Sequence, residues 1–219
     1  MRKELLLLAV MLLVALPVLG QNINVDMSER AGTPDPSFAG AGYAGVWNVS
    51  NGGCAWDEPV SLVDIDNSAI LATISYPESW ACTYDADYSS PGPATGNDEA
   101  LLEDGFALGD IPEQVVFENL INGPYRVICY GIYTFDSSNV TGFSINGNSQ
   151  GCGGEYSGAY EEGITHVIFD VVVDDGSLVI QWNAGTPWGS GFVSGVQLEN
   201  TDIVATDKKT WGGLKAIYQ

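Results

Sequence analysis

The sequence predicts an all-β protein whose main body is an antiparallel β-sandwich. From about residue 40 the chain consists of short runs rich in apolar and β-branched residues, and Gly, Asn, Asp and Pro separate these runs. The chain contains 27 glycines and 10 prolines, while 45% of its residues are hydrophobic. This hydrophobic content excludes a disordered chain. Many short strands separated by turn residues are typical of a sandwich or a barrel.

The first 20 residues, MRKELLLLAVMLLVALPVLG, have the pattern of a signal peptide. Arg2 and Lys3 precede an apolar run that extends from Leu5 to Leu16, and the small residue Gly20 ends the segment. The run is shorter than the roughly 20 residues that a transmembrane helix needs, and no later stretch is long enough either. We therefore expect a secreted or cell-surface protein with no membrane span after signal removal. The alternative is a retained N-terminal anchor.

After the signal peptide (residues 1–20) we expect three segments. Residues 21–39 are a linker or first strand, residues 40–200 form the β-sandwich domain, and residues 201–219 are a C-terminal tail. The strands of the sandwich are expected at residues 44–49, 60–65, 69–76, 113–120, 125–135, 140–147, 164–173, 177–184 and 191–199.

Three segments of the sandwich have distinctive patterns. The strand at 125–135, YRVICYGIYTF, is largely apolar on both faces, which predicts a strand covered on both sides or one with a binding face. The tripeptides at 122–124 (Asn-Gly-Pro) and 174–176 (Asp-Asp-Gly) lie between apolar runs and predict hairpin turns. The segment 97–110, NDEALLEDGFALGD, is the one stretch with helical character.

The tail differs from the sandwich in composition. Its last 14 residues, TDKKTWGGLKAIYQ, hold three of the seven basic residues of the chain and place four apolar residues at helical spacing: Trp211, Leu214, Ile217 and Tyr218. This pattern predicts a short amphipathic helix, which two central glycines weaken. We interpret the tail either as a sorting or docking signal for a surface partner or as a frayed end.

The charge of the chain excludes several partners. Seven basic and 28 acidic residues give a net charge of −21. Such a surface repels phosphate backbones, so nucleic acid is not expected as a partner, and an anionic membrane surface is disfavoured for the same reason. The carboxylates either keep the protein soluble or attract a divalent cation, which prefers oxygen ligands.

Four cysteines follow the signal peptide: Cys54, Cys82, Cys129 and Cys152. There is no C-x-x-C pair, and with the single histidine His166 a zinc site has little to build on. An even number of cysteines in an exported chain predicts two disulfides, for which three pairings exist. We favour Cys54–Cys82 and Cys129–Cys152, because each pair brackets loop-rich sequence in which a crosslink removes unfolded-chain entropy.

No catalytic signature stands out. A serine or cysteine triad would have to use His166, which lies in the strand-like run ITHVIFDVVV, where an exposed or packed strand position fits it better. A glycosidase needs only two carboxylates, and 28 acidic residues always offer pairs. We therefore expect that the protein is not an enzyme.

Six phrases of the sequence together resemble one family. They are AGYAGVWNVSNG, ALLEDGFALGD, VVFENLINGPYRVICYGIY, FSINGN, VVVDDGSLVIQW and SGVQLE. In this order, which covers about residues 40–199, they resemble the galactose-binding-domain-like jelly-roll modules of secreted bacterial surface proteins, which are similar to carbohydrate-binding modules. The resemblance implies two facing antiparallel sheets, with residues 191–199 as the last strand beside the opening strands. It also implies sugar binding through loops at one end, often with a structural calcium ion.

Sugar recognition requires exposed aromatic faces with carboxylates or amides beside them. Four aromatic residues in expected loops meet this description: Trp56, Trp80, Tyr84 and Trp188. The alternative for each is packing over the edge of the sandwich. By contrast, Trp47 and Trp182 lie within expected strands, so we predict that both belong to the core.

Asp85 and Asp87 are the candidate calcium ligands, with turn solvation as the alternative. The leading functional prediction is a secreted, non-catalytic carbohydrate-binding module whose partner is an extracellular glycan. A structural cell-surface or extracellular-matrix protein with no glycan ligand is the other hypothesis, since acidity, disulfides and a distinct tail suit it equally well.

Overall fold

A computed structural model describes residues 21–50, 58–76, 82–85, 92–107, 113–184 and 191–202. Residues 21–202 form one compact unit. The predicted signal peptide and the tail beyond Asp202 lie outside the described residues. Within the described part of the chain, no helix is long and apolar enough to cross a membrane.

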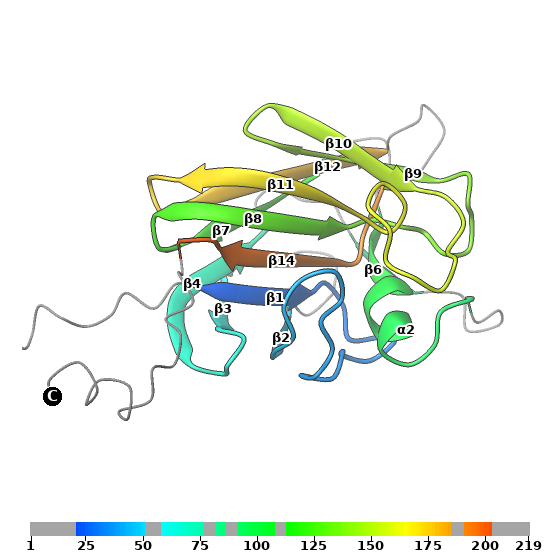
Figure 1. The fold of residues 1–219 in the computed structure, drawn as a ribbon, viewed down its shortest axis with the longest axis horizontal. Helices are drawn as coiled ribbons and strands as arrows, with labels where there is room; N and C mark the ends of the chain where they lie inside the picture. Colours follow the sequence, from blue (N-terminus) through cyan, green and yellow to red (C-terminus); the bar gives the residue numbers. More distant parts are fainter. Residues whose placement is uncertain are drawn as a thin grey trace, which may run out of the picture. The chain divides into compact units, whose positions relative to one another are not determined.

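The protein is all-β, as the sequence predicted, and its strands form two main sheets and one small sheet (Figure 1). Sheet A has five strands in the order β11 (His166–Val173), β8 (Gly123–Tyr130), β14 (Gly195–Asn200), β1 (Asn22–Asp26) and β2 (Trp47–Val49). Sheet B has six in the order β10 (Asn148–Gly153), β9 (Val140–Ile145), β12 (Leu178–Ala184), β7 (Glu113–Glu118), β4 (Ala69–Ser75) and β3 (Val60–Val63). The small sheet C joins β13 (Phe192–Val193), β6 (Asp104–Ala107) and β5 (Cys82–Asp85).

Neighbouring strands run antiparallel, except that β1 and β2 are parallel. The closing strand β14 lies between β8 and β1, in register from Gly195 opposite Asp26 to Glu199 opposite Asn22. The last strand therefore returns beside the opening strand, as the resemblance implied. Residues 22–26, expected as linker or first strand, form that opening strand.

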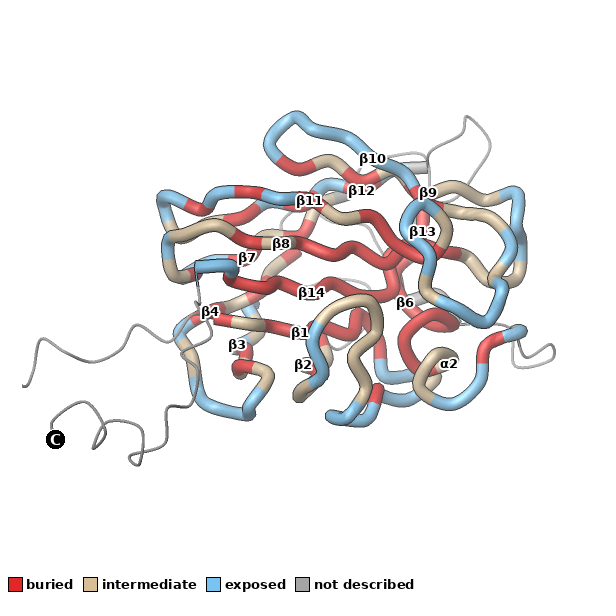
Figure 2. The backbone as a smooth tube through the Cα atoms, viewed as in Figure 1, coloured by how far each residue is buried: buried red, intermediate tan, exposed pale blue. Residues whose placement is uncertain are grey.

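Alternation along the strands builds the core between sheets A and B. In β9 the side chains of Thr141, Phe143 and Ile145 are buried while their neighbours are half-buried, which is the period of two that a strand imposes. Trp182 in β12 and Trp47 in β2 are both buried, as predicted; Trp182 lies in this core, and Trp47 lies in a second buried cluster. Figure 2 shows the buried segments of β8, β14 and β1 running side by side.

The two predicted hairpin turns are wrong in one respect, because each joins strands of different sheets. Residues 119–122 connect β7 of sheet B to β8 of sheet A, and residues 174–177 connect β11 of sheet A to β12 of sheet B. The two connections lie side by side, since the Leu120 N–H donates to the Gly176 carbonyl at 2.9 Å. Turn residues mark a reversal of the chain, but they do not say whether the next strand pairs with the previous one or crosses to the facing sheet.

A true hairpin occurs where the sequence analysis placed only a single strand. β9 and β10 pair antiparallel through a tight turn at Asn146 and Gly147, which have φ angles of 51° and 79°. Two positive φ angles define a type I′ turn, for which Asn-Gly is the preferred sequence. Asn146 and Gly147 were therefore a direct signal for the edge strand β10.

The segment 97–110 is helical only in its first part. Helix α2 spans Asn97–Leu102, and the chain then enters β6. Gly105 in β6 has a φ of 154°, and a Cβ there would lie 2.3 Å from the Val193 carbonyl oxygen of the neighbouring β13. The tight approach of these two strands therefore requires a glycine at this position. Similarly, the expected strand 125–135 ends at Tyr130.

The structure shows two of the four cysteines in full. Cys129 in β8 and Cys152 in β10 are both buried, and they are not bonded to each other in the structure. Cys82 begins β5, of which only the backbone is described, and Cys54 lies outside the described residues. The predicted pairing remains a prediction.

Candidate functional site

The outer face of sheet A, which points away from sheet B, carries a second cluster of buried apolar residues. Ile128 and Tyr130 project there from β8, and α2 and two loops cover them. The first loop, residues 38–46, precedes β2, and the second, residues 154–165, precedes β11. Three segments far apart in the sequence therefore meet at one end of sheet A (Figure 1).

Five aromatic residues of this cluster form what we call the aromatic patch: Phe38, Trp47, Tyr130, Tyr156 and Tyr160. The Tyr160 ring makes edge contacts with Phe38 and Tyr130, at centroid distances of 6.0 and 5.8 Å. Trp47 packs on Tyr130 at 6.5 Å, and its indole N–H donates to the Phe38 carbonyl at 3.2 Å. Trp47 and Tyr130 are buried, whereas Phe38, Tyr156 and Tyr160 are half-buried. The half-buried rings leave apolar surface in contact with solvent.

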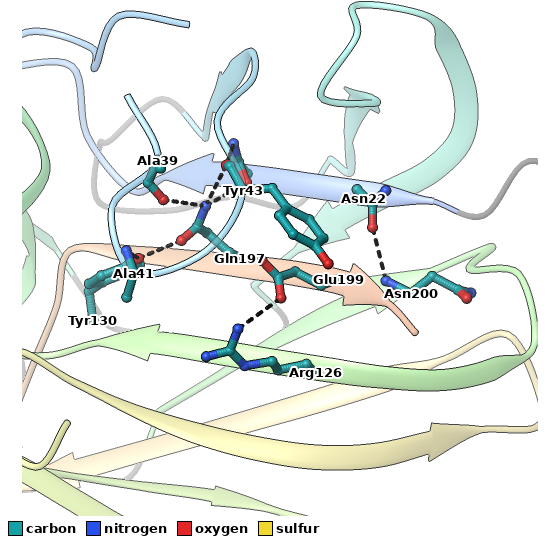
Figure 3. A network of polar contacts seen from close by, with 10 residues as sticks. Asn22, Ala39, Ala41, Tyr43, Arg126, Tyr130, Gln197, Glu199 and Asn200 are labelled. Carbon is teal, nitrogen blue, oxygen red and sulfur yellow. Dashed lines mark hydrogen bonds and ion pairs between the residues drawn. The ribbon is translucent and has the colours of Figure 1, made fainter. Parts of the chain in front are cut away.

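A buried glutamine holds the first loop on the sheet. The Gln197 amide nitrogen lies 2.8 Å from Asn24 Oδ1, 3.2 Å from the Ala39 carbonyl and 3.1 Å from the Tyr43 carbonyl (Figure 3). The Tyr130 hydroxyl donates to the Gln197 side-chain oxygen. One side chain of β14 therefore positions the loop that supplies Phe38 to the aromatic patch.

The same loop rests directly on the strands. The Ala41 N–H donates to the Tyr130 hydroxyl at 2.7 Å. A Cβ on Gly42 would lie 2.6 Å from Glu199 Oε1 and 2.8 Å from Gln197 Oε1, so a larger residue would have to displace these side chains. The glycine at this position lets the loop approach the sheet closely.

An ion pair adjoins this network. Arg126 in β8 contacts Glu199 in β14 at 3.2 Å, and Asp170 lies opposite Arg126 on the other neighbouring strand. Burial raises the pKa of Glu199, while the Arg126 guanidinium lowers it. Arg126 thus partly compensates the cost of a carboxylate that is almost completely buried.

A carboxylate and an amide of α2 lie beside the aromatic patch and the chain that leads into it. The Tyr156 hydroxyl donates to Asp98 Oδ2 at 2.7 Å, and the Asp35 N–H donates to Asn97 Oδ1 at 2.8 Å. Burial, followed by the hydrogen bond and charge of Asp98, raises the pKa of Tyr156. Two basic residues, Arg30 and Arg126, occur in the described part of the chain. The rim of the aromatic patch is therefore an acidic and amide-bearing environment.

His166 is a packed strand residue, as predicted. It begins β11, is buried against Tyr130 at a centroid distance of 5.8 Å, and its Nδ1 lies 2.9 Å from the Thr165 hydroxyl. Burial lowers the pKa of His166, which keeps the ring neutral near pH 7. The Thr165 hydroxyl donates to the Glu161 carbonyl and accepts the Glu161 N–H, so it is committed to the loop backbone.

A pair of buried carboxylates lies on the other side of β14. Asp26 ends β1 and Asp104 begins β6, and both side chains are fully buried. One turn binds both carboxylates, because Asp26 accepts the Ser28 N–H at 3.2 Å and Asp104 accepts the Ala31 N–H at 2.5 Å. Burial, and then the neighbouring Asp104 charge, raises the pKa of Asp26 well above its usual range.

Two oxygens in this region lack hydrogen-bond partners among the described residues. They are Asp26 Oδ2 and the hydroxyl of Ser194, which immediately precedes β14. Asp85, one of the two predicted calcium ligands, lies opposite Asp104 in the β5–β6 register. Among the described residues, no group of three or more His, Cys, Asp or Glu side chains is placed to hold a metal ion. The available donors are therefore two carboxylates and one hydroxyl.

Most of the aromatic residues predicted to bind sugar cannot be placed. Trp56, Trp80 and Trp188, like the predicted metal ligand Asp87, lie outside the described residues, and only the backbone of Tyr84 is described, in β5. The aromatic patch was not predicted. The sequence does contain a signal for it, namely aromatic residues within glycine-rich runs. Phe38 lies in SFAGAGYAG, and Tyr156 and Tyr160 lie in GGEYSGAYEEG, just as Trp188 lies in GTPWGSG.

Comparison with solved structures returns glycosidases and carbohydrate-binding modules of low sequence identity. The chain is 19% identical to a Bacteroides uniformis β-glucuronidase 2, with a TM-score of 0.49 over 83% of this chain and 18% of that chain. It is 16% identical to a family 35 carbohydrate-binding module of Clostridium thermocellum, with a TM-score of 0.32 over 60% of this chain and 99% of the module. For TmCBM61 in complex with β-1,4-galactotriose the identity is 15% and the TM-score 0.28, over 59% of this chain and 88% of that one.

The chain thus spans about a fifth of the length of the β-glucuronidase chain. No protein-family model and no curated protein matches it. Carbohydrate-binding modules are among the solved structures that the comparison returns, at TM-scores below 0.5.

Proposed function

We propose that the protein is a secreted, non-catalytic carbohydrate-binding module that contacts sugar at the aromatic patch. The observation that carries this proposal is the meeting of half-buried Phe38, Tyr156 and Tyr160 with Asp98 at one end of sheet A. Apolar ring faces suit the C–H side of a pyranose, while carboxylate and amide oxygens accept hydrogen bonds from its hydroxyls. The site thus offers both kinds of contact that a sugar requires.

The charge around the patch narrows the class of glycan. Two of the covering segments carry acidic residues: Asp98 of α2, which accepts the Tyr156 hydroxyl, and Glu161 of the second loop. Uronic acids and sulfated sugars would be repelled, because like charges at short range cost free energy and Arg126, the cation that adjoins the patch, is already paired with Glu199. The preferred ligand is therefore a neutral glycan.

The proposal is tested with a glycan array on the mature protein, followed by titration of any hit against variants. Phe38→Ala and Tyr156→Ala should each weaken binding about tenfold or more, which corresponds to roughly 1.4 kcal/mol. Leu71→Ala is the matched control, because Leu71 is an exposed apolar residue (83% accessible) on the outer face of sheet B. If both patch variants bind the glycan as the wild type does, the aromatic patch is not the glycan-binding site. No binding to any glycan, together with ordered self-association, would favour the structural surface protein.

A calcium ion at the buried carboxylates is part of the same proposal. Asp26, Asp104 and the Ser194 hydroxyl supply hard oxygen donors, which calcium prefers, and the ion would neutralise two buried charges. Backbone carbonyls and water would complete its coordination. Calcium should raise the melting temperature, since a ligand of the native state stabilises by RT ln(1 + [L]/Kd).

The test compares melting curves in millimolar calcium and in chelator, for the wild type and for Asp26→Asn. The variant removes one negative charge from the pair and keeps the shape of the side chain, so it should melt at the same temperature in both conditions. Asp35→Asn is the control, because Asp35 is exposed and should retain the full response. Identical wild-type melting curves in calcium and in chelator would show that the folded protein binds no calcium ion.

A further inference from the structure

The two sheets approach each other closely where β8 faces β9. Gly131 follows β8, and a Cβ there would lie 2.5 Å from the Phe143 ring of β9. The Thr141 hydroxyl of β9 donates to the Gly131 carbonyl at 2.7 Å and accepts the Phe192 N–H at 2.9 Å. Thr141 thus fixes sheet B to the chain that leaves sheet A at this point.

This contact brings two cysteines together from different sheets. Cys152 in β10 lies directly opposite Thr141 of β9, so the Cα atoms of Cys152 and Thr141 are about 4.5–5.5 Å apart. Cys129 lies two residues before Gly131, roughly 7 Å along the chain and on the same face of β8. Both side chains belong to the core between the sheets and are fully buried.

We infer that Cys129 and Cys152 form a disulfide that joins sheet A to sheet B when the protein folds in an oxidising compartment. The two thiols lose two protons and two electrons, and an S–S bond forms between their sulfurs. The electrons and protons pass to the disulfide of a thiol oxidant, which becomes a dithiol. The crosslink would attach the edge hairpin β9–β10 to strand β8.

The surroundings of the thiols determine when this bond forms. Burial raises the pKa of Cys129, the neighbouring Cys152 raises it further, and burial raises the pKa of Cys152 to about 12. Thiol–disulfide exchange needs a thiolate and access to it, so both cysteines are unreactive once the sandwich has closed. The bond must therefore form during folding, and a folded reduced protein should resist oxidation for hours.

The first experiment is a peptide map of the full chain after export to an oxidising compartment. Free thiols are alkylated in denaturant without reduction, and the protein is cut with chymotrypsin, which cleaves after Tyr133, Phe135 and Phe143 between the two cysteines. A crosslinked peptide pair containing Cys129 and Cys152 is expected. Alkylation of both residues, or a link from either one to Cys54 or Cys82, would overturn the inference.

The second experiment measures the effect on stability in the variant Cys54→Ser/Cys82→Ser, which retains only this pair. Protein refolded with oxidised glutathione should melt about 5–10 °C higher than protein refolded with reductant, as expected for a closed loop of about 24 residues. Adding Cys152→Ala should abolish the difference between the two preparations. Equal melting temperatures with and without oxidant, in a variant that folds, would overturn the inference; if the variant does not fold, the peptide map of the wild type decides.

Discussion

Replacing Gln197 by Met tests the role of the amide that holds the first loop on sheet A. Methionine has a similar volume and fills the same space, so the change removes hydrogen bonds with little loss of packing. In the folded variant the Ala39 carbonyl and Asn24 Oδ1 lose their shared donor, and the Tyr130 O–H loses its acceptor. The Tyr43 carbonyl keeps the Asn24 amide at 3.1 Å, and the Tyr130 hydroxyl keeps the Ala41 N–H at 2.7 Å.

The magnitude follows from the groups left without partners. Each buried polar group that loses its hydrogen bond costs about 1–3 kcal/mol, so three such groups should lower the free energy of unfolding by about 3–9 kcal/mol. Gln181→Met is the matched control, because Gln181 lies exposed on β12. An exposed substitution of this kind should change stability by less than about 0.5 kcal/mol.

Urea unfolding followed by far-UV circular dichroism measures both variants, and amide hydrogen exchange reports on the loop itself. Protection of residues 39–43 should fall in Gln197→Met and stay unchanged in Gln181→Met. If Gln197→Met loses less than about 1 kcal/mol, or loses no more than the control, the amide does not hold the loop and the reasoning is refuted.

Three further predictions concern pH, the core and the glycan site. In chelator, the free energy of unfolding should rise as the pH falls through the raised pKa of Asp26. The reason is that the Asp26 carboxyl binds a proton more tightly in the folded state than in the unfolded chain, and the gain should be complete below about pH 4. Urea midpoints at several pH values should show a smaller rise in Asp26→Asn, and an equal rise would assign the effect to other groups. Ile74→Ala should lower the free energy of unfolding by about 2–5 kcal/mol because Ile74 is fully buried, whereas Leu71→Ala on the same strand should change it by less than about 0.5 kcal/mol. Similar denaturation midpoints for the two variants would contradict the placement of Ile74 on the inner face of β4 and of Leu71 on the outer face. If the patch variants bind glycan normally, the site is expected at the loop of Trp188 instead: Trp188→Ala should then weaken binding about tenfold while changing stability by less than about 0.5 kcal/mol, and a strongly destabilised variant would show that the indole packs.

The sequence predicted the features of the fold that local patterns determine. Strand periodicity placed Trp47 and Trp182 in the core, and both are buried. Turn residues located the connections at 122–124 and 174–176, but they could not reveal that these cross between sheets, since that depends on which strands pair. The Asn146-Gly147 dipeptide is a local signal for the hairpin of β9 and β10, which the sequence analysis did not predict.

The candidate site was less accessible to sequence reasoning, because its parts are distant in the chain. Phe38 and Tyr160 touch although 121 residues separate them, and no local pattern pairs one glycine-rich run with another. The buried carboxylates illustrate the same difficulty. Asp26 resembled a polar residue at the end of a strand, and its unusual environment arises only when Asp104 is placed beside it.

The position of β14 in sheet A has a consequence for how the chain reaches its folded state. Residues 195–200 occupy the place between β8 and β1, so the first strand has no antiparallel partner until the last strand arrives more than 160 residues later. A ribosome-bound or partly translocated chain therefore cannot complete this sheet, and folding must wait for nearly the whole polypeptide. Such non-local pairing slows folding. If the protein is exported, as proposed above, delayed closure would keep the polypeptide unfolded for passage through a secretion channel and would leave its cysteines open to an oxidant on the far side until β14 inserts.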